Sequence, residues 1–122
     1  MIENAGEIRR LPGKAKGRVG GSAFAGLVWV AAVPDTTDSD ITAQAVDLFA
    51  KLERMLSEMG SDRTRVISAT VYLSSLGNKP AFDEAWVAWA GENPEHWPQR
   101  TCVGAELVKG ILVEIKLLAA EA

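Results

Sequence analysis

Arg100, Cys102 and Glu114 are the residues whose types and spacing could do chemistry. Arg100 and Cys102 are two positions apart in a segment that predicts a strand, so both side chains point to one face. Glu114 lies on the following segment, which we expect to pair with the first as a hairpin, so arginine, thiol and carboxylate should converge. A guanidinium binds a carboxylate through two parallel hydrogen bonds, and a nearby carboxylate can orient or deprotonate a water. The alternative is a surface ion pair between Arg100 and Glu114, worth at most about 1 kcal/mol.

Other kinds of chemistry have weaker signals. The single cysteine and the single histidine, His96, predict neither an intrachain disulfide nor a metal site. The first 20 residues are rich in glycine and basic side chains, but their spacing matches neither a Walker A loop nor GxGxxG, so we expect a solvated basic loop. With 13 basic against 16 acidic residues, the net charge of −3 disfavours nucleic acid and anionic membranes as partners.

The elements that must position these residues follow from hydrophobic periodicity. Residues 22–33 predict extended structure, residues 38–59 a helix with one apolar stripe, and residues 66–73 a strand that alternates apolar and polar positions. Residues 78–91 predict a second helix, with Asn78 as its cap and Trp86 and Trp89 on its apolar side. Residues 100–107 and 112–120 are the two arms of the expected hairpin.

The order β-β-α-β-α-β-β predicts an α+β fold, in which two helices cover one face of a mixed sheet. At 122 residues, 48 % of them hydrophobic, we expect one domain over residues 1–122 with the basic, glycine-rich segment at 1–20. Residues 23–33 are too few to span a bilayer, and the start Met-Ile-Glu-Asn is not a targeting segment, which predicts a cytoplasmic protein. The strands at 27–33 and 112–120 are apolar on both sides, so the face without helices should need a partner.

Two segments near the C-terminus resemble a known family. Pro98-Gln-Arg-Thr-Cys-Val103, followed by Val113-Glu-Ile-Lys-Leu-Leu-Ala-Ala120, is similar to the C-terminal signature of the reactive intermediate deaminase (Rid) family. The likeness extends upstream through Ile67-Ser-Ala-Thr-Val-Tyr-Leu73 and Phe82-Asp-Glu-Ala-Trp86, and it covers about residues 18 to 120.

The resemblance implies a chorismate-mutase-like fold and a homotrimer with active sites between subunits. It also implies hydrolysis of enamines and imines such as 2-aminoacrylate to a keto acid and ammonia, without a cofactor. Arg100 would then bind the substrate carboxylate, and Glu114 would position the attacking water. Cys102 would line the pocket, or would be a small buried hydrophobic residue.

Four predicted substrate-binding residues depart from the family pattern. Ala31-Ala32 replaces a Ser-Gly pair, so a hydroxyl is missing and the pocket should be narrower. Arg18 stands where some members have tyrosine or tryptophan, and Asp83 where several have asparagine. A second cation would favour a more acidic substrate, whereas a carboxylate would oppose it. Two alternatives remain: a non-catalytic regulatory module that binds small carboxylates, and an RNA-acting protein that uses the basic segment.

Overall fold

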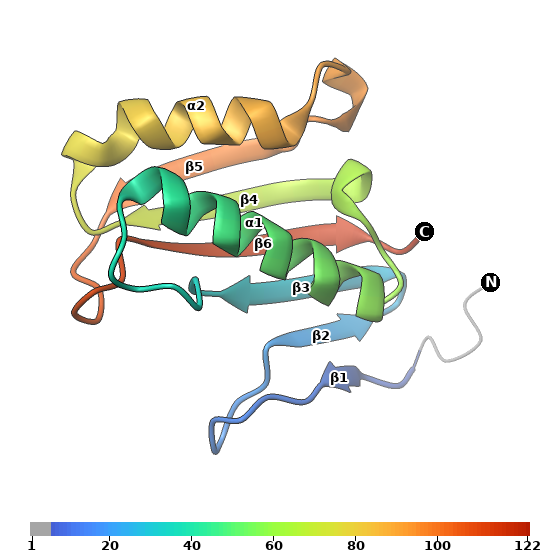
Figure 1. Cartoon of the computed structure of the whole chain (residues 1–122). Coiled ribbons are helices and arrows are strands. Elements are labelled where there is room, and N and C mark those ends of the chain that lie inside the picture. The colour runs from blue at the N-terminus through green and yellow to red at the C-terminus, as the bar shows by residue number, and fades with distance from the viewer. Residues whose placement is uncertain (1–5) are drawn as a thin grey trace.

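The fold is one mixed sheet with two helices on the same face (Figure 1). A computed structural model describes residues 6–122, so the first five residues of the basic segment, including the Met-Ile-Glu-Asn start, lie outside the described part. The helices are α1 (Ile41–Glu58) and α2 (Lys79–Ala90). The strands are β1 (Arg9–Leu11), β2 (Gly21–Phe24), β3 (Leu27–Ala32), β4 (Val66–Leu73), β5 (Gln99–Gly104) and β6 (Val113–Ala120).

The strand order in the sheet is β1-β2-β3-β6-β4-β5. All neighbouring strands are antiparallel except β4 and β5, which are parallel. The predicted α+β, chorismate-mutase-like arrangement with both helices on one face is confirmed. One strand was missed, because β1 lies within the segment that we expected to be a loop.

The hairpin predicted for residues 100–120 is wrong. β6 lies between β3 and β4 at the centre of the sheet, whereas β5 lies at the edge and pairs with no described strand except β4. β4, α2 and β5 form a strand–helix–strand unit, and such a connection brings its second strand back parallel to the first. The apolar run of β6, buried at alternate positions, occupies the central place instead.

Helix α1 forms as its sequence predicts. The carboxylate of Asp40 accepts a hydrogen bond from the Ala43 backbone N–H at 2.8 Å and caps the helix, and Gly60 follows its end with φ +84°. The apolar stripe is buried against the sheet and α2, and it consists of Ile41, Ala45, Leu48, Phe49, Leu52, Leu56 and Met59.

Two predicted strands differ in detail. Residues 22–33 are split into β2 and β3 by a tight turn at Ala25-Gly26, where both residues have positive φ, 51° and 86°. In β4, a register shift between Val66 and Ser68 turns Ile67 outward, so its side chain is 45 % exposed although the alternation predicted it to be buried.

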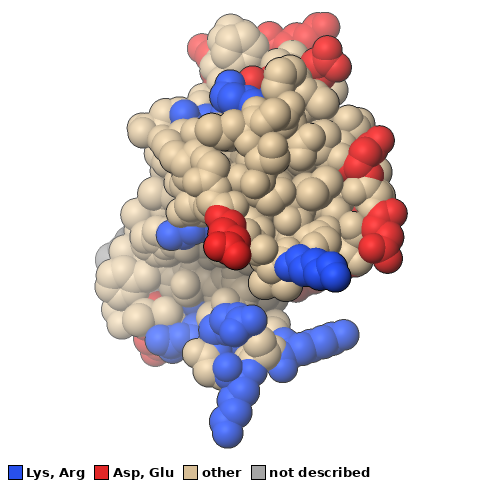
Figure 2. Space-filling view, turned by 90° about the vertical axis from the view of Figure 1, so that its left-hand side faces the viewer, with Lys and Arg blue, Asp and Glu red and all other residues tan. Residues whose placement is uncertain are grey.

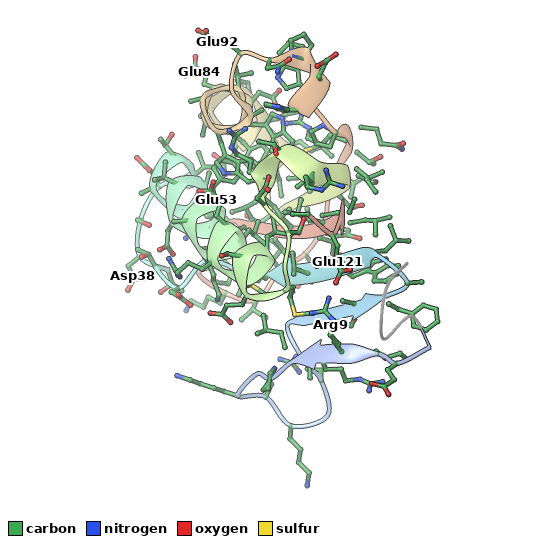
Figure 3. All side chains as sticks on the ribbon, turned by 90° about the vertical axis from the view of Figure 1, so that its right-hand side faces the viewer. Arg9, Asp38, Glu53, Glu84, Glu92 and Glu121 are labelled. Carbon is green, nitrogen blue, oxygen red and sulfur yellow. The ribbon has the colours of Figure 1, made fainter. Side chains whose placement is uncertain are left out.

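The long loop between β1 and β2 carries the basic side chains predicted for this segment. Lys14, Lys16 and Arg18 are exposed there, and Figure 2 shows basic side chains gathered at this end of the molecule. Arg9 of β1 forms an ion pair with Glu121 (Figure 3) and donates a hydrogen bond to the Met59 carbonyl at 3.3 Å, and these contacts hold β1 against the rest of the chain.

No helix among residues 6–122 is long and apolar enough to cross a membrane.

Gln44 is a buried polar residue of α1 that joins two loops. Its amide nitrogen donates hydrogen bonds to the carbonyls of Thr37 and Gly110, and its amide oxygen accepts one from the Leu112 backbone N–H, each at 2.8 Å. The side chain is fully buried. Through these bonds α1 fixes the entry to β6 and thereby the position of Glu114.

Candidate functional site

Arg100 lies on edge strand β5 and points toward the helix-covered side of the sheet. Its register partner on β4 is Ala69, which is buried on that side. The guanidinium carbon lies 5.1 Å from the ring centroid of Trp86 and 5.6 Å from that of Phe82, both on α2. A cation held over aromatic faces is both attracted and fixed in orientation. The side chain of Arg100 is 18 % exposed, so the guanidinium is sheltered and still reachable.

Asp83 of α2 is the direct partner of Arg100. Its Oδ1 accepts a hydrogen bond from Arg100 Nη2 at 2.7 Å, and its Oδ2 accepts one from Lys79 Nζ at 2.7 Å. Lys79 and Asp83 are four residues apart and therefore lie on the same side of α2. Burial raises the pKa of the Asp83 carboxyl, but the hydrogen bonds from Lys79 and Arg100 outweigh it and bring that pKa below its ordinary value. Asp83 is therefore a carboxylate at neutral pH.

Cys102 follows Arg100 by two residues on β5 and shares its face of the sheet. Its register partner is Val71, which is fully buried, and the cysteine itself is half-buried against the hydrophobic core. Both predicted roles, lining a pocket beside Arg100 and filling the core edge, are compatible with this place.

Glu114 lies on the opposite face of the sheet, so the predicted convergence with Arg100 is wrong within one chain. Its register partner is Tyr72, whereas Leu117 is in register with Ala69 and hence with Arg100. Side chains an odd number of residues apart on a strand point to opposite faces. The alternative of an ion pair between Arg100 and Glu114 is also wrong, because Arg100 pairs with Asp83 instead.

The three remaining predicted substrate-binding residues lie far from Arg100. Arg18 is exposed in the loop before β2, and β2 is separated from β5 by four strand spacings, which is about 19 Å. Ala31 is on the face without helices, opposite Lys116, whereas Ala32 is opposite Ile115 and faces the helices. Of the seven predicted site residues, only Asp83, Arg100 and Cys102 come together in one chain.

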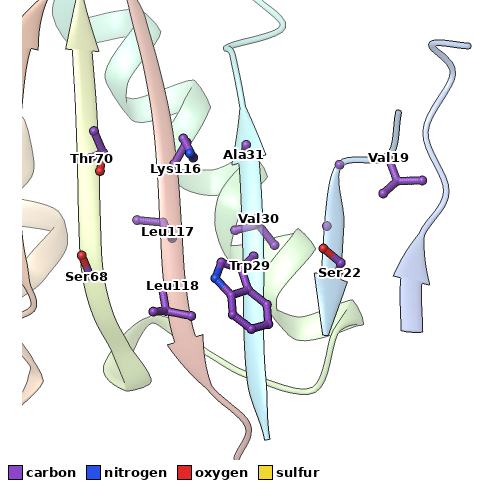
Figure 4. A pocket seen from close by; sticks show the side chains of 12 residues that line it. Val19, Ser22, Trp29, Val30, Ala31, Ser68, Thr70, Lys116, Leu117 and Leu118 are labelled. Atoms are coloured by element: carbon purple, nitrogen blue, oxygen red, sulfur yellow. The ribbon is translucent and has the colours of Figure 1, made fainter. Parts of the chain in front are cut away.

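A hollow of about 220 Å³ lies on the face without helices (Figure 4). Ala31 lines it together with Lys116, Trp29 and Thr70, and the loop residues Val19 and Gly20, next to Arg18, form its rim. Glu114 is two residues from Lys116 on the same face of β6. Asp83, Arg100 and Cys102 therefore lie together at the β5 edge, Ala31 lines this hollow with Arg18 and Glu114 near it in the chain, and Ala32 belongs to neither group.

Sequence reasoning missed the partners that hold Arg100. Trp86 was predicted only to lie on the apolar side of its helix, in core or subunit contacts, and Lys79 was not considered. The spacing of Lys79 and Asp83 was a usable signal for an ion pair, but nothing in the sequence indicated that α2 would cover Arg100.

The comparisons with known proteins identify the family. The model of the family described as Endoribonuclease L-PSP matches residues 23–121. The chain belongs to this family, the Rid or YjgF family. It is 33 % identical to the RutC family protein YoaB from Escherichia coli K12 over 89 residues, which cover 72 % of this chain and 76 % of that protein.

Solved structures agree with this assignment. A YjgF family protein from Neisseria meningitidis has 30 % sequence identity and a TM-score of 0.86, and the match covers 98 % of both chains. The Rid family protein YyfA from Yersinia pestis has 19 % identity and a TM-score of 0.82 over 91 % of this chain and 93 % of that one, which shows the fold alone.

The described part of this Rid chain holds no cluster of three or more histidine, cysteine, aspartate or glutamate side chains suited to a metal ion. Its chemical groups are a sheltered guanidinium with its carboxylate partner on one side of the sheet, and a carboxylate and an amine on the other.

Proposed function

We propose that this protein hydrolyses reactive enamine and imine intermediates to a keto acid and ammonia, and that Arg100 binds the substrate carboxylate. The observation that carries the proposal is the guanidinium held over Trp86 and Phe82. A guanidinium has five N–H donors, and within residues 6–122 the only hydrogen bond of Arg100 through its side chain goes to Asp83. Membership of a family that includes deaminases supports the same activity.

The reaction needs positioning more than it needs strong catalytic groups. An iminium carbon is already electrophilic, so holding the substrate carboxylate on Arg100 and a water beside that carbon supplies most of the acceleration. Attack by the water gives a carbinolamine, from which ammonia leaves and the keto acid remains. Glu114 would orient this water and accept its proton. No cofactor enters this scheme.

We further propose that the active site forms between the subunits of a homotrimer. Arg100 and Glu114 lie on opposite faces of one sheet, so the two can act on one substrate only if a second copy supplies one of them. The face without helices also exposes large apolar side chains, with Trp29 40 % and Val103 39 % exposed, which favours a partner there. Light scattering at micromolar concentration should give three times the 13.1 kDa of one chain, and a mass near 13.1 kDa would contradict the trimer.

The separation of Arg100 from Glu114 also favours a second candidate, a non-catalytic module that binds small carboxylates. Such a module needs only Arg100 to bind its ligand, so a single chain is sufficient. The two candidates differ in turnover: the module would bind a keto acid through Arg100 and release none from an imine.

The test is a coupled assay in which imino acids are generated in situ from several amino acids and keto acid release is measured. Arg100→Lys keeps the charge but loses the planar fork, so the rate should fall at least about tenfold while the melting temperature changes little. Arg54→Lys, at an exposed position on α1, is the matched control and should retain the full rate. If the wild type releases no keto acid but binds a keto acid through Arg100, the protein is the non-catalytic binding module. Full activity of Arg100→Lys would refute carboxylate binding through the fork.

Small carboxylates rather than nucleic acids or membranes are the proposed partners. The exposed basic residues of the β1–β2 loop lie at the sheet edge opposite Arg100, and Arg100 is itself paired with a carboxylate. A cytoplasmic location remains a prediction from the sequence.

A further inference from the structure

The contact between Arg100 and Asp83 leaves most of the guanidinium free. Arg100 donates one hydrogen bond to Asp83 Oδ1, through Nη2, and its other N–H groups have no partner within the described residues. Trp86 and Phe82, whose ring centroids lie 5.1 and 5.6 Å from the guanidinium carbon, accept no hydrogen bond from these N–H groups. A ligand carboxylate that binds the free edge would therefore lie beside the Asp83 carboxylate instead of replacing it.

Lys79 holds Asp83 in place independently of Arg100. The two oxygens of Asp83 have separate partners, Arg100 on one and Lys79 on the other, both at 2.7 Å. If the ligand draws Arg100 away from Oδ1, the carboxylate remains held through Oδ2. A negative charge thus stays next to the bound ligand, with one of its oxygens available to accept a hydrogen bond.

Arg100 and Asp83 present opposite charges side by side, with Lys79 on the other oxygen of Asp83, and the Arg100–Asp83 pair favours a ligand with the reverse arrangement of charges. A simple carboxylate is attracted by Arg100 and repelled by Asp83. In an amino acid or a protonated imino acid, the carboxyl group and the positive nitrogen are attached to the same carbon. Such a ligand can place its carboxylate on Arg100 and donate a hydrogen bond from its nitrogen to Asp83, so both contacts are attractive.

We propose that Asp83 makes this site selective for zwitterionic ligands, in which a carboxylate is adjacent to a protonated nitrogen. The inference rests on the proposed function, because it assumes that Arg100 binds the ligand carboxylate. The charge of Asp83 would also make the site bind the substrate more tightly than the product. The iminium group and water give a carbonyl group and an ammonium ion, so the keto acid product has lost the positive nitrogen and is repelled by Asp83, which promotes its release.

The test compares L-alanine with propionate, which has the same skeleton but lacks the ammonium group. Dissociation constants are measured by NMR titration of the indole signals, which suits millimolar affinities, for the wild type, Arg100→Lys, Asp83→Asn and Glu84→Gln. Asp83→Asn keeps the shape of the side chain and removes its charge. Glu84→Gln removes a charge from the next residue of α2, which is exposed, and is the matched control.

We expect the wild type to bind L-alanine more tightly than propionate, and the ratio of the two dissociation constants to fall about tenfold in Asp83→Asn and to stay unchanged in Glu84→Gln. Equal affinities in the wild type, or the same ratio in Asp83→Asn, would refute the selectivity. Failure of the proposed function is distinct: it would appear as no Arg100-dependent binding of either ligand and no keto acid release in the coupled assay.

Discussion

Replacing Gln44 with leucine should destabilise the protein by about 3 kcal/mol. The side chain makes three hydrogen bonds of 2.8 Å, to Thr37, Gly110 and Leu112, and each is worth about 1 kcal/mol net. Leucine fits the buried volume but leaves the Leu112 N–H and two carbonyls without these partners. For a domain of this size, with a urea m-value of about 2 kcal/mol/M, the unfolding midpoint should fall by about 1.5 M.

The measurement is urea unfolding followed by tryptophan fluorescence and by circular dichroism. Arg54→Leu, on the exposed side of α1, is the matched control, because arginine and leucine have similar helix propensities and Arg54 lies ten residues, about 15 Å along the helix, from Gln44. Its midpoint should change little. If the Gln44→Leu midpoint stays within about 0.3 M of that of the control, the three hydrogen bonds do not stabilise the protein by about 1 kcal/mol each.

Glu114→Gln should lower the rate of keto acid release about 10²-fold if proton transfer to Glu114 contributes to hydrolysis, while calorimetry should show keto acid binding unchanged or tighter. Loss of binding together with turnover would instead make Glu114 a ligand-binding residue. The pKa values of Asp47, Asp62 and Asp83 all lie below the ordinary 3.8, because each carboxylate accepts hydrogen bonds in the folded chain. Their stabilising contribution is therefore complete above the unfolded pKa and is lost as the pH falls through the lower folded values. The urea midpoint should decrease as the pH falls from 5 to 2, and Asp47→Asn should flatten that decrease; a midpoint independent of pH would contradict it.

Helix α1 could be predicted because local rules and tertiary packing agree there. Its stripe from Ile41 to Met59, its cap and its terminal glycine all indicate the same helix, and that helix covers the sheet. The bulge at Ile67 could not be predicted, because Val66 and Ile67 are both apolar and the alternation from Ile67 to Leu73 gives no sign of a register shift.

The prediction that Arg100 and Glu114 converge was wrong because segments adjacent in the sequence are not adjacent in the sheet. Residues 100–107 and 112–120 are adjacent in the chain, and a short connection favours a hairpin. The connection through α2, however, pairs β5 with β4, and β6 enters the middle of the sheet. Arg100 and Cys102 keep the shared face that their spacing predicts, whereas the relation of either residue to Glu114 depended on the wrong pairing.

Strand alternation makes the separation of Arg100 from Glu114 a property of the fold rather than of side-chain rotamers. Ala69 links Arg100 to Leu117 in register, and Glu114 is three positions from Leu117 on β6, so no rotation of either side chain brings Arg100 and Glu114 to one face of the sheet. Moving Arg100 to the other face would need a one-residue slip of β5, which would also lift Cys102 out of the core edge. Either Arg100 works without Glu114, or a second chain completes the site. Hydrolysis that uses both Arg100 and Glu114 therefore requires assembly of two chains. Selectivity between a zwitterion and a simple carboxylate requires only Arg100, Asp83 and Lys79 of one chain.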